Sequence, residues 1–96
     1  MSAVRSIIAK WDTPARFGRA IDLKVINHAH QMWDRMSIPP LRWPAVVEAA
    51  ARDEIKGVTI EALMAAHVAD EPLRRARLER VRRAHPKENT QEARAS

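Results

Sequence analysis

Five polar residues along one predicted helix have side chains that could contact a nucleic acid. They stand at i, i+3, i+4, i+7 and i+11, a spacing that places them on one helix face: Lys24, Asn27, His28, Gln31 and Arg35. The amides of Asn and Gln can pair bidentately with adenine, and a histidine nitrogen can donate to or accept from a base edge. Asn27, His28 and Gln31 are therefore the candidates for reading bases. A solvated helix face is the alternative explanation of the same stripe.

Phosphate contacts are expected from cations and from the first turns of helices. The candidates are Thr13, Arg16, Lys24 and Arg42, and ordinary surface charge is the alternative for each of them. The opposite face of the same helix is apolar and should face the core, with its residues at Val25, Ala29, Met32 and Met36. Trp33 is expected in the core rather than in a contact.

The residue types in this sequence give little indication of an enzyme. The chain has no cysteine, which excludes disulfides, thiolate zinc sites and a cysteine nucleophile. His28 and His30 lie two apart, about 200° around a helix, so they cannot share a metal. His67 and His85 are expected as partly exposed helix-end residues. The sequence predicts no enzyme, no metal, no cofactor and no small-molecule substrate.

Capping residues and prolines divide the first half of the chain into helices. Apolar spacing predicts a helix over residues 4–11, and Asp12-Thr13-Pro14 then supplies a cap and a proline for a second helix to about Ile21. Asp22 is expected to end that helix and to cap a third one, from about Leu23 to Arg35. The resulting helix, short turn and helix over residues 13–35 is the layout of a helix-turn-helix.

The second half is predicted to hold further helices. Pro39 and Pro40 end the third helix, and a fourth begins between Pro40 and Pro44. Thr59 is expected to cap a fifth helix that runs to about Ala66. From Pro72 to Ala84 the chain reads PLRRARLERVRRA, which predicts a basic helix with a narrow apolar stripe.

Two segments resemble the Cro and phage-repressor family of helix-turn-helix proteins. They are TPARFGRAIDL, at residues 13–23, and MWDRMSIPP, at residues 32–40. The segments WPAVV and GVTIEAL are similar to the continuation in short prophage-type regulators, so the resemblance covers about residues 4–66. Asp22 stands where the family usually has a turn glycine, and Gly18 replaces the usual alanine. The resemblance implies that the third helix enters the major groove and that a dimer binds a symmetric operator.

Charge and length limit the remaining possibilities. The 96 residues carry 17 Lys and Arg against 12 Asp and Glu, a net charge of +5 that suits a polyanionic partner. Residues 1–70 hold 9 basic and 8 acidic side chains, whereas residues 71–96 hold 8 and 4. The apolar runs are too short to cross a membrane, and no signal peptide is recognisable, which predicts a cytoplasmic protein without a membrane partner.

The sequence therefore predicts an all-α helix-turn-helix bundle of about five helices plus a basic C-terminal helix. The expected parts are a DNA-binding domain over residues 1–70, an arginine-rich helix over 71–85 and a disordered tail over 86–96. The expected function is sequence-specific binding of double-stranded DNA as a homodimeric transcriptional repressor. The main alternative is a small helical protein-interaction module or inhibitor. A nonspecific nucleic-acid binder driven by the arginine helix is the second, and it would lose binding when residues 71–96 are removed.

Overall fold

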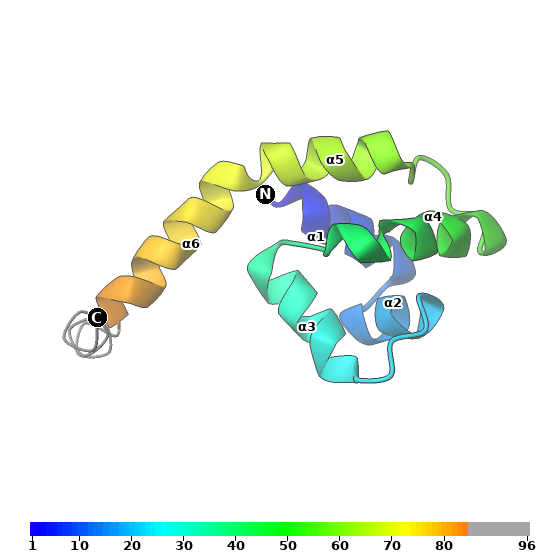
Figure 1. Ribbon diagram of the computed structural model, residues 1–96, viewed down its shortest axis with the longest axis horizontal. Helices are drawn as coiled ribbons and strands as arrows, with labels where there is room; N and C mark the ends of the chain where they lie inside the picture. Colours follow the sequence, from blue (N-terminus) through cyan, green and yellow to red (C-terminus); the bar gives the residue numbers. More distant parts are fainter. Residues whose placement is uncertain (85–96) are drawn as a thin grey trace.

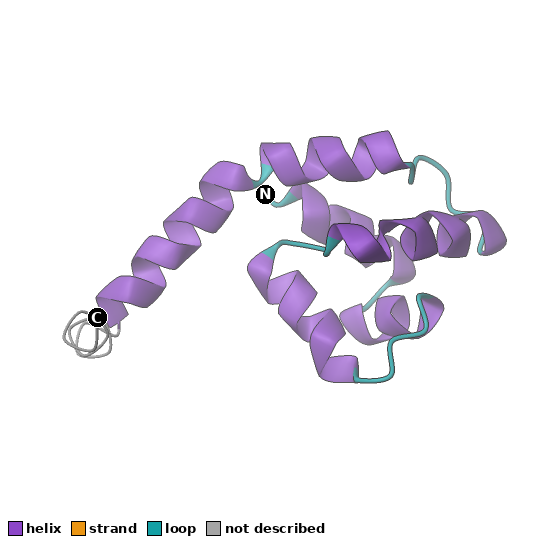
Figure 2. Ribbon diagram, viewed as in Figure 1, coloured by secondary structure: helices purple, strands orange, loops and turns teal. Residues whose placement is uncertain are grey.

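The computed structural model describes residues 1–84, and every regular element in that part of the chain is a helix (Figure 2). The predicted all-α class is thus confirmed. The elements in chain order are α1 (Ala3–Ile8), the 3₁₀ helix η1 (Ala9–Trp11), α2 (Pro14–Ala20), α3 (Ile26–Arg35), the 3₁₀ helix η2 (Pro40–Arg42), α4 (Trp43–Arg52), α5 (Ile60–Ala69) and α6 (Glu71–Ala84). His85 and the tail predicted over residues 86–96 lie outside the described residues.

Local caps set the helix starts that the sequence predicts. The Thr13 hydroxyl accepts from the backbone N–H of Arg16 at 3.1 Å, and Pro14 occupies the first turn of α2. The Thr59 hydroxyl caps α5 in the same way, at 3.0 Å from the N–H of Ala62. The helix α5 continues to Ala69, three residues beyond the predicted end.

The expected cap and start of α3 are wrong. Asp22 has φ +60° and makes no cap; it occupies the left-handed turn position, which aspartate tolerates better than most residues. The helix begins at Ile26 with Val25 as N-cap, so Leu23 is a buried residue of the turn rather than the first residue of the helix. Val25, expected in the buried stripe, is 49% exposed.

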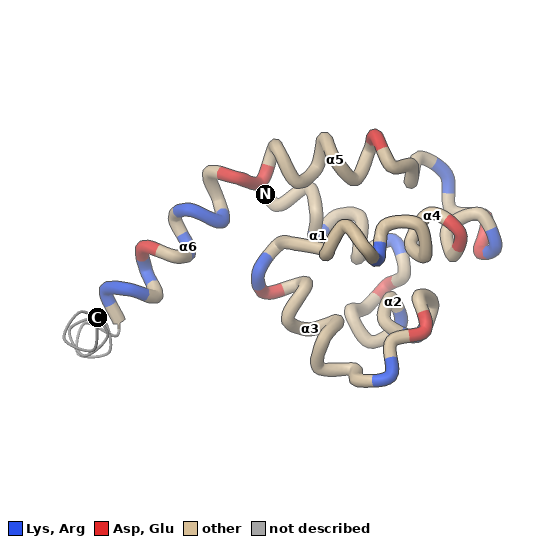
Figure 3. The backbone as a smooth tube through the Cα atoms, in the orientation of Figure 1, with Lys and Arg blue, Asp and Glu red and all other residues tan. Residues whose placement is uncertain are grey.

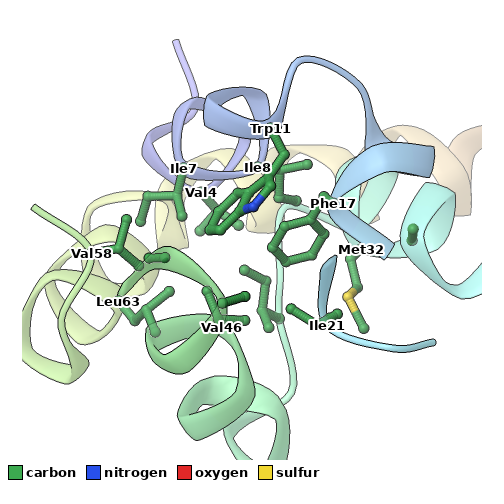
Figure 4. Close-up of a cluster of buried hydrophobic side chains, with 14 of the residues drawn as sticks. Val4, Ile7, Ile8, Trp11, Phe17, Ile21, Met32, Val46, Val58 and Leu63 are labelled. Carbon is green, nitrogen blue, oxygen red and sulfur yellow. The ribbon is translucent and has the colours of Figure 1, made fainter. Parts of the chain in front are cut away.

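One hydrophobic core joins α1 to α5, and Figure 4 shows side chains from all of these helices meeting there. The rings of Trp11 and Phe17 make an edge contact, with centroids 5.3 Å apart. The largest apolar side chains with almost no exposure are Val4, Ile8, Phe17, Ile38, Val46 and Leu63. Burial of this apolar surface is the main force that holds α2 and α3 in place.

His67 is partly exposed in the last turn of α5, as expected, and its ring also makes structural hydrogen bonds that the sequence did not predict. Its Nε2 accepts from the backbone N–H of Ile38 at 2.8 Å, and its Nδ1 lies 2.6 Å from the carbonyl oxygen of Leu63. A carbonyl can only accept, so Nδ1 carries the proton. The ring also lies 5.0 Å from that of Trp43, and the histidine therefore fixes the segment after α3 against α5.

The junction between α5 and α6 is held by a buried carboxylate. Asp70 is 1% exposed and accepts from the Ser2 hydroxyl (2.5 Å), the Ala3 N–H (2.7 Å) and the Val4 N–H (2.9 Å). Burial raises the pKa of Asp70, but these hydrogen bonds and the charge of Arg74 lower it more, to a net value below its usual 3.8. Beyond this junction α6 projects from the body (Figure 1).

Candidate nucleic-acid interface

The α2–α3 pair is a tightly packed helix-turn-helix unit. A Cβ added to Gly18 would lie 3.0 Å from the Cβ of Ala29, so the missing side chain allows α2 to approach α3 closely. The turn is closed by the Leu23 N–H, which donates to the Gly18 carbonyl oxygen at 2.8 Å. Of the two bulky residues of α3, Met32 is the buried one and Trp33 is half-buried. The core-facing side of α3 is thereby defined.

The predicted base-reading residues all lie on the solvent side of α3. Asn27, His28, Gln31 and Arg35 are exposed, and at 3.6 residues per turn they span an arc of about 100°. His30 and Asp34 are also exposed on this helix and were missed by the sequence reasoning, because the stripe chosen there did not include them.

Part of this arc continues into a shallow groove against η2. His28, Gln31 and Arg35 line a hollow of about 220 Å³ together with Met32, Ser37, Pro39 and Arg42. A neighbouring hollow of about 390 Å³ is lined by Lys24, His28 and Arg42, with Asp22 and Val25. The structure therefore gathers five of the predicted contact residues around two adjoining hollows: Lys24, His28, Gln31, Arg35 and Arg42. Lys24 contributes from the turn, not from the helix.

Two other predicted contacts lie elsewhere. Thr13 uses its hydroxyl to cap α2, and the Arg16 guanidinium lies 3.3 Å from the carboxylate of Asp12. Neither residue lines the hollows beside α3. Their contact with phosphate stays a prediction, as does that of Asn27 with a base.

The C-terminal end of α3 is held by arginines from two other helices. Arg5 of α1 donates from Nε to the Trp33 carbonyl oxygen (2.8 Å) and from Nη2 to that of Asp34 (3.1 Å). Its guanidinium also lies 5.5 Å from the Trp33 ring centroid. Arg74 of α6 donates to the Met36 carbonyl oxygen at 3.2 Å. The Trp33 carbonyl oxygen also accepts from the backbone N–H of Met36, and the arginines add donors to the carbonyls at this helix end. These contacts fix the direction of α3.

Charge near this helix end is shaped by α6. The Arg77 guanidinium lies 2.6 Å from the carboxylate of Asp34, so the acidic group on α3 is paired. Lys24, Arg35 and Arg42 contribute positive charge along the adjoining surface. Sequence reasoning missed Arg5, Arg74 and Arg77 because nothing in their local spacing shows that they reach α3.

Neither a metal site nor a membrane span is found in the part of the chain that the structure describes. Within residues 1–84 no three His, Cys, Asp or Glu side chains are grouped so that they could bind a metal ion. None of the helices over the same residues is both long and apolar enough to span a membrane.

Comparison of the chain with protein-family models, with curated proteins and with solved structures finds no match. The resemblance to the Cro and phage-repressor family therefore rests on the quoted segments alone.

Proposed function

We propose that this chain is a cytoplasmic, sequence-specific DNA-binding transcriptional regulator, a repressor of phage or prophage type, and not an enzyme. The observation that carries the proposal is the exposed polar arc of α3, held rigidly by α2 and bordered by the cation of Arg42 on η2. A helix presented in this way can enter the major groove with its side chains toward base edges.

The surface divides into two chemical parts. Asn27, His28 and Gln31 offer hydrogen-bonding groups suited to bases, while Lys24 and Arg42 flank them with charges suited to phosphates. Arg35, in the last turn of α3, lines the same hollow as Gln31 and Arg42 and can contact either a base or a phosphate. Cations at the edges and neutral amides in the middle are the distribution that a groove-binding helix requires.

Pairing of two copies is supported by α5. This helix buries Leu63 on one side, yet its other side exposes Ile60 (38%), Met64 (55%) and Val68 (67%) at a spacing of four residues. Glu61 is the only Asp, Glu, Lys or Arg in the sequence of α5, and the helix is mostly tan in Figure 3. A helix that is apolar on both sides is normally covered on both. We propose that a second copy covers this side and gives the homodimer that a symmetric operator needs.

The dimer is tested by sedimentation of a Met64→Lys variant beside the wild type. We expect a wild-type dimer and a folded monomeric variant, since the new charge would be buried at the interface. A monomeric wild type, both free and with DNA, contradicts the pairing.

DNA recognition is tested by selection from a pool of randomised duplex DNA at near-physiological salt. Recovery of a palindromic motif with half-sites about one helical turn apart supports the proposal. Retention without a motif would favour a nonspecific binder, and no retention would exclude DNA as the ligand.

The alternative, a helical protein-interaction module, is favoured by the same exposed side of α5. Salt dependence separates the two functions. Phosphate contacts release counterions, so binding to DNA should fall steeply as salt rises, whereas binding to an apolar protein surface should change little.

A further inference from the structure

A groove lies where α6 leaves the body beside the end of α3. It has a volume of about 460 Å³ and is lined by Arg35, Ser37, Arg74, Arg77, Leu78 and Val81. A second hollow of about 500 Å³ shares Arg77 and Val81 with it and adds Arg5 and Arg80. We call the first of these hollows the α3–α6 groove.

Apolar side chains of the α3–α6 groove remain open to solvent. Leu78 is 52% exposed and Val81 is 42% exposed, one helical turn apart on α6. The helix has no buried residue, although Leu73 in its first turn packs against the core. The body of the protein therefore covers the start of the apolar stripe on α6 and leaves its continuation uncovered.

Three of the other four lining residues are arginines; Arg77 is paired with Asp34, and Arg74 donates to the carbonyl oxygens of Met36 and His67. Arg35 contributes from α3, and Arg74 and Arg77 contribute from α6; among the residues that the structure describes, no acidic side chain lines the groove. In the second hollow the acidic residue is Asp34, which is already paired with Arg77 at 2.6 Å. Figure 3 shows that basic positions dominate the length of α6. A ligand that fills this groove must supply both apolar surface and negative charge.

We propose that the α3–α6 groove binds an acidic amphipathic helix of another protein. Aliphatic side chains along one face of such a helix would cover Leu78 and Val81, and flanking carboxylates would meet the surrounding guanidinium groups. The occupant thereby matches both features of the groove.

Two other occupants fit less well. A second copy of α6 would bring the six arginines of each helix together, against two glutamates in each. The phosphates of a nucleic acid would satisfy the arginines but would offer Leu78 and Val81 no apolar surface. Repulsion between the arginines disfavours the first pairing, and the exposed aliphatic side chains argue against the second.

Arg35 gives the groove a regulatory consequence. It lines both the α3–α6 groove and the hollow between α3 and η2, so a bound acidic helix would occupy a cation that DNA also needs. The acidic partner should therefore compete with DNA. This competition rests on the proposed function, whereas binding of the acidic helix does not.

The test is fluorescence anisotropy of the full chain with synthetic helical peptides and without DNA. The first peptide places leucines along one helix face with glutamates beside them, and the second scrambles the same residues so that no apolar face forms. The first should bind at least about tenfold more tightly, because only an aligned face can cover the aliphatic pair.

Two double variants locate the binding surface. Leu78→Ser with Val81→Ser should weaken the first peptide about tenfold or more, since both side chains are exposed and their loss leaves the fold intact. Met64→Ser with Val68→Ser removes exposed apolar side chains of α5 instead. This variant should weaken the proposed dimer but leave peptide binding unchanged, because the α3–α6 groove lies within one copy.

Three results would overturn the proposal. Equal binding of both peptides would show a general polyanion surface, and unchanged peptide binding by the α6 double variant would show that the groove is not the site. A change from dimer to monomer in that variant would identify a second copy as the occupant.

Failure of DNA competition, with peptide binding intact, would bear on the proposed DNA function and on the shared role of Arg35. It would leave the α3–α6 groove as a protein-binding site.

Discussion

The helices α3 and α6 both expose cations, but they are held in different ways. Ala29 and Met32 of α3 are buried in the core, and Gly18 of α2 packs directly against this helix. No residue of α6 is buried; the helix is held by Leu73 at its start and by the polar contacts of Arg74 and Arg77. The orientation of α3 thus depends on the stability of the whole domain, whereas that of α6 depends on a few contacts.

This difference suits two kinds of recognition. Reading base edges requires side chains held in a fixed register, which a helix backed by the core provides. Binding a protein segment does not require such a fixed register, so a helix that the body contacts mainly at one end, as α6 is, can adjust to its partner. Substitutions in the core behind α3 and in the contacts of α6 test this difference.

The largest effect is expected from Phe17→Ala. Phe17 is fully buried between α1 and α3 and contacts the ring of Trp11, so its loss should lower the free energy of unfolding by about 3–5 kcal/mol. Urea denaturation monitored by tryptophan fluorescence measures the change. Leu78→Ala on α6 is the control, and its effect should stay within about 0.5 kcal/mol because this side chain is half exposed. Similar losses in the two variants would contradict the contrast.

A smaller effect is expected from Asp70→Asn at the junction that holds α6. The amide cannot accept from all three donors that the carboxylate binds, so the free energy of unfolding should fall by about 1–3 kcal/mol. Asp22→Asn is a matched control, because asparagine also tolerates the left-handed turn at that exposed position. Equal stability of the Asp70→Asn variant and the wild type would show that the junction is not a stabilising contact.

The same carboxylate predicts the pH dependence of stability. Because folding lowers the pKa of Asp70 below 3.8, the unfolded chain takes up the proton first as the pH falls. The stabilisation by the ionised Asp70 is therefore complete above the pKa of the unfolded chain. It is lost as the pH falls through the pKa of the folded protein. Urea midpoints measured between about pH 6 and pH 2 should converge for the wild type and Asp70→Asn at the acid end. A constant difference would contradict this assignment.

The smallest effect is expected from Arg77→Ala. The pair with Asp34 is partly open to solvent, with 26% and 66% of the two side chains exposed, so overall stability should change by about 1 kcal/mol or less. Hydrogen exchange should nevertheless quicken in α6 and not in α3, since the pair links the two helices. Lys56→Ala, a turn residue between α4 and α5, removes the same charge far from α6 and should leave both rates unchanged. Faster exchange in α3 alone would contradict the account.

The features that the sequence predicted correctly depend on neighbouring residues. Thr13 before Pro14 and Thr59 before an apolar helix are local signals, and both caps are present. Asp22 misled the prediction because aspartate suits both an N-cap and a left-handed turn, and spacing alone does not distinguish them. The observed N-cap, Val25, has no side chain that can cap, so its residue type does not predict a helix start.

The candidate surface was partly predictable for the same reason. Helical spacing correctly gave the exposed side of α3, since the buried positions Ala29 and Met32 recur with the helical period. The hollow with Arg42 and the α3–α6 groove depend on how η2 and α6 are placed after turns of the chain. That placement follows from long-range contacts, such as those of Asp70 with α1 and of Arg74 with the end of α3.

Repeating the duplex selection with Gln31→Ala tests directly whether α3 reads DNA bases. We expect a motif that loses preference at one position of each half-site, by about 1–3 kcal/mol, with little change in binding to unrelated DNA. The control Lys56→Ala should return the wild-type motif. An unchanged motif from Gln31→Ala and from Asn27→Ala would contradict the claim that this face of α3 reads bases.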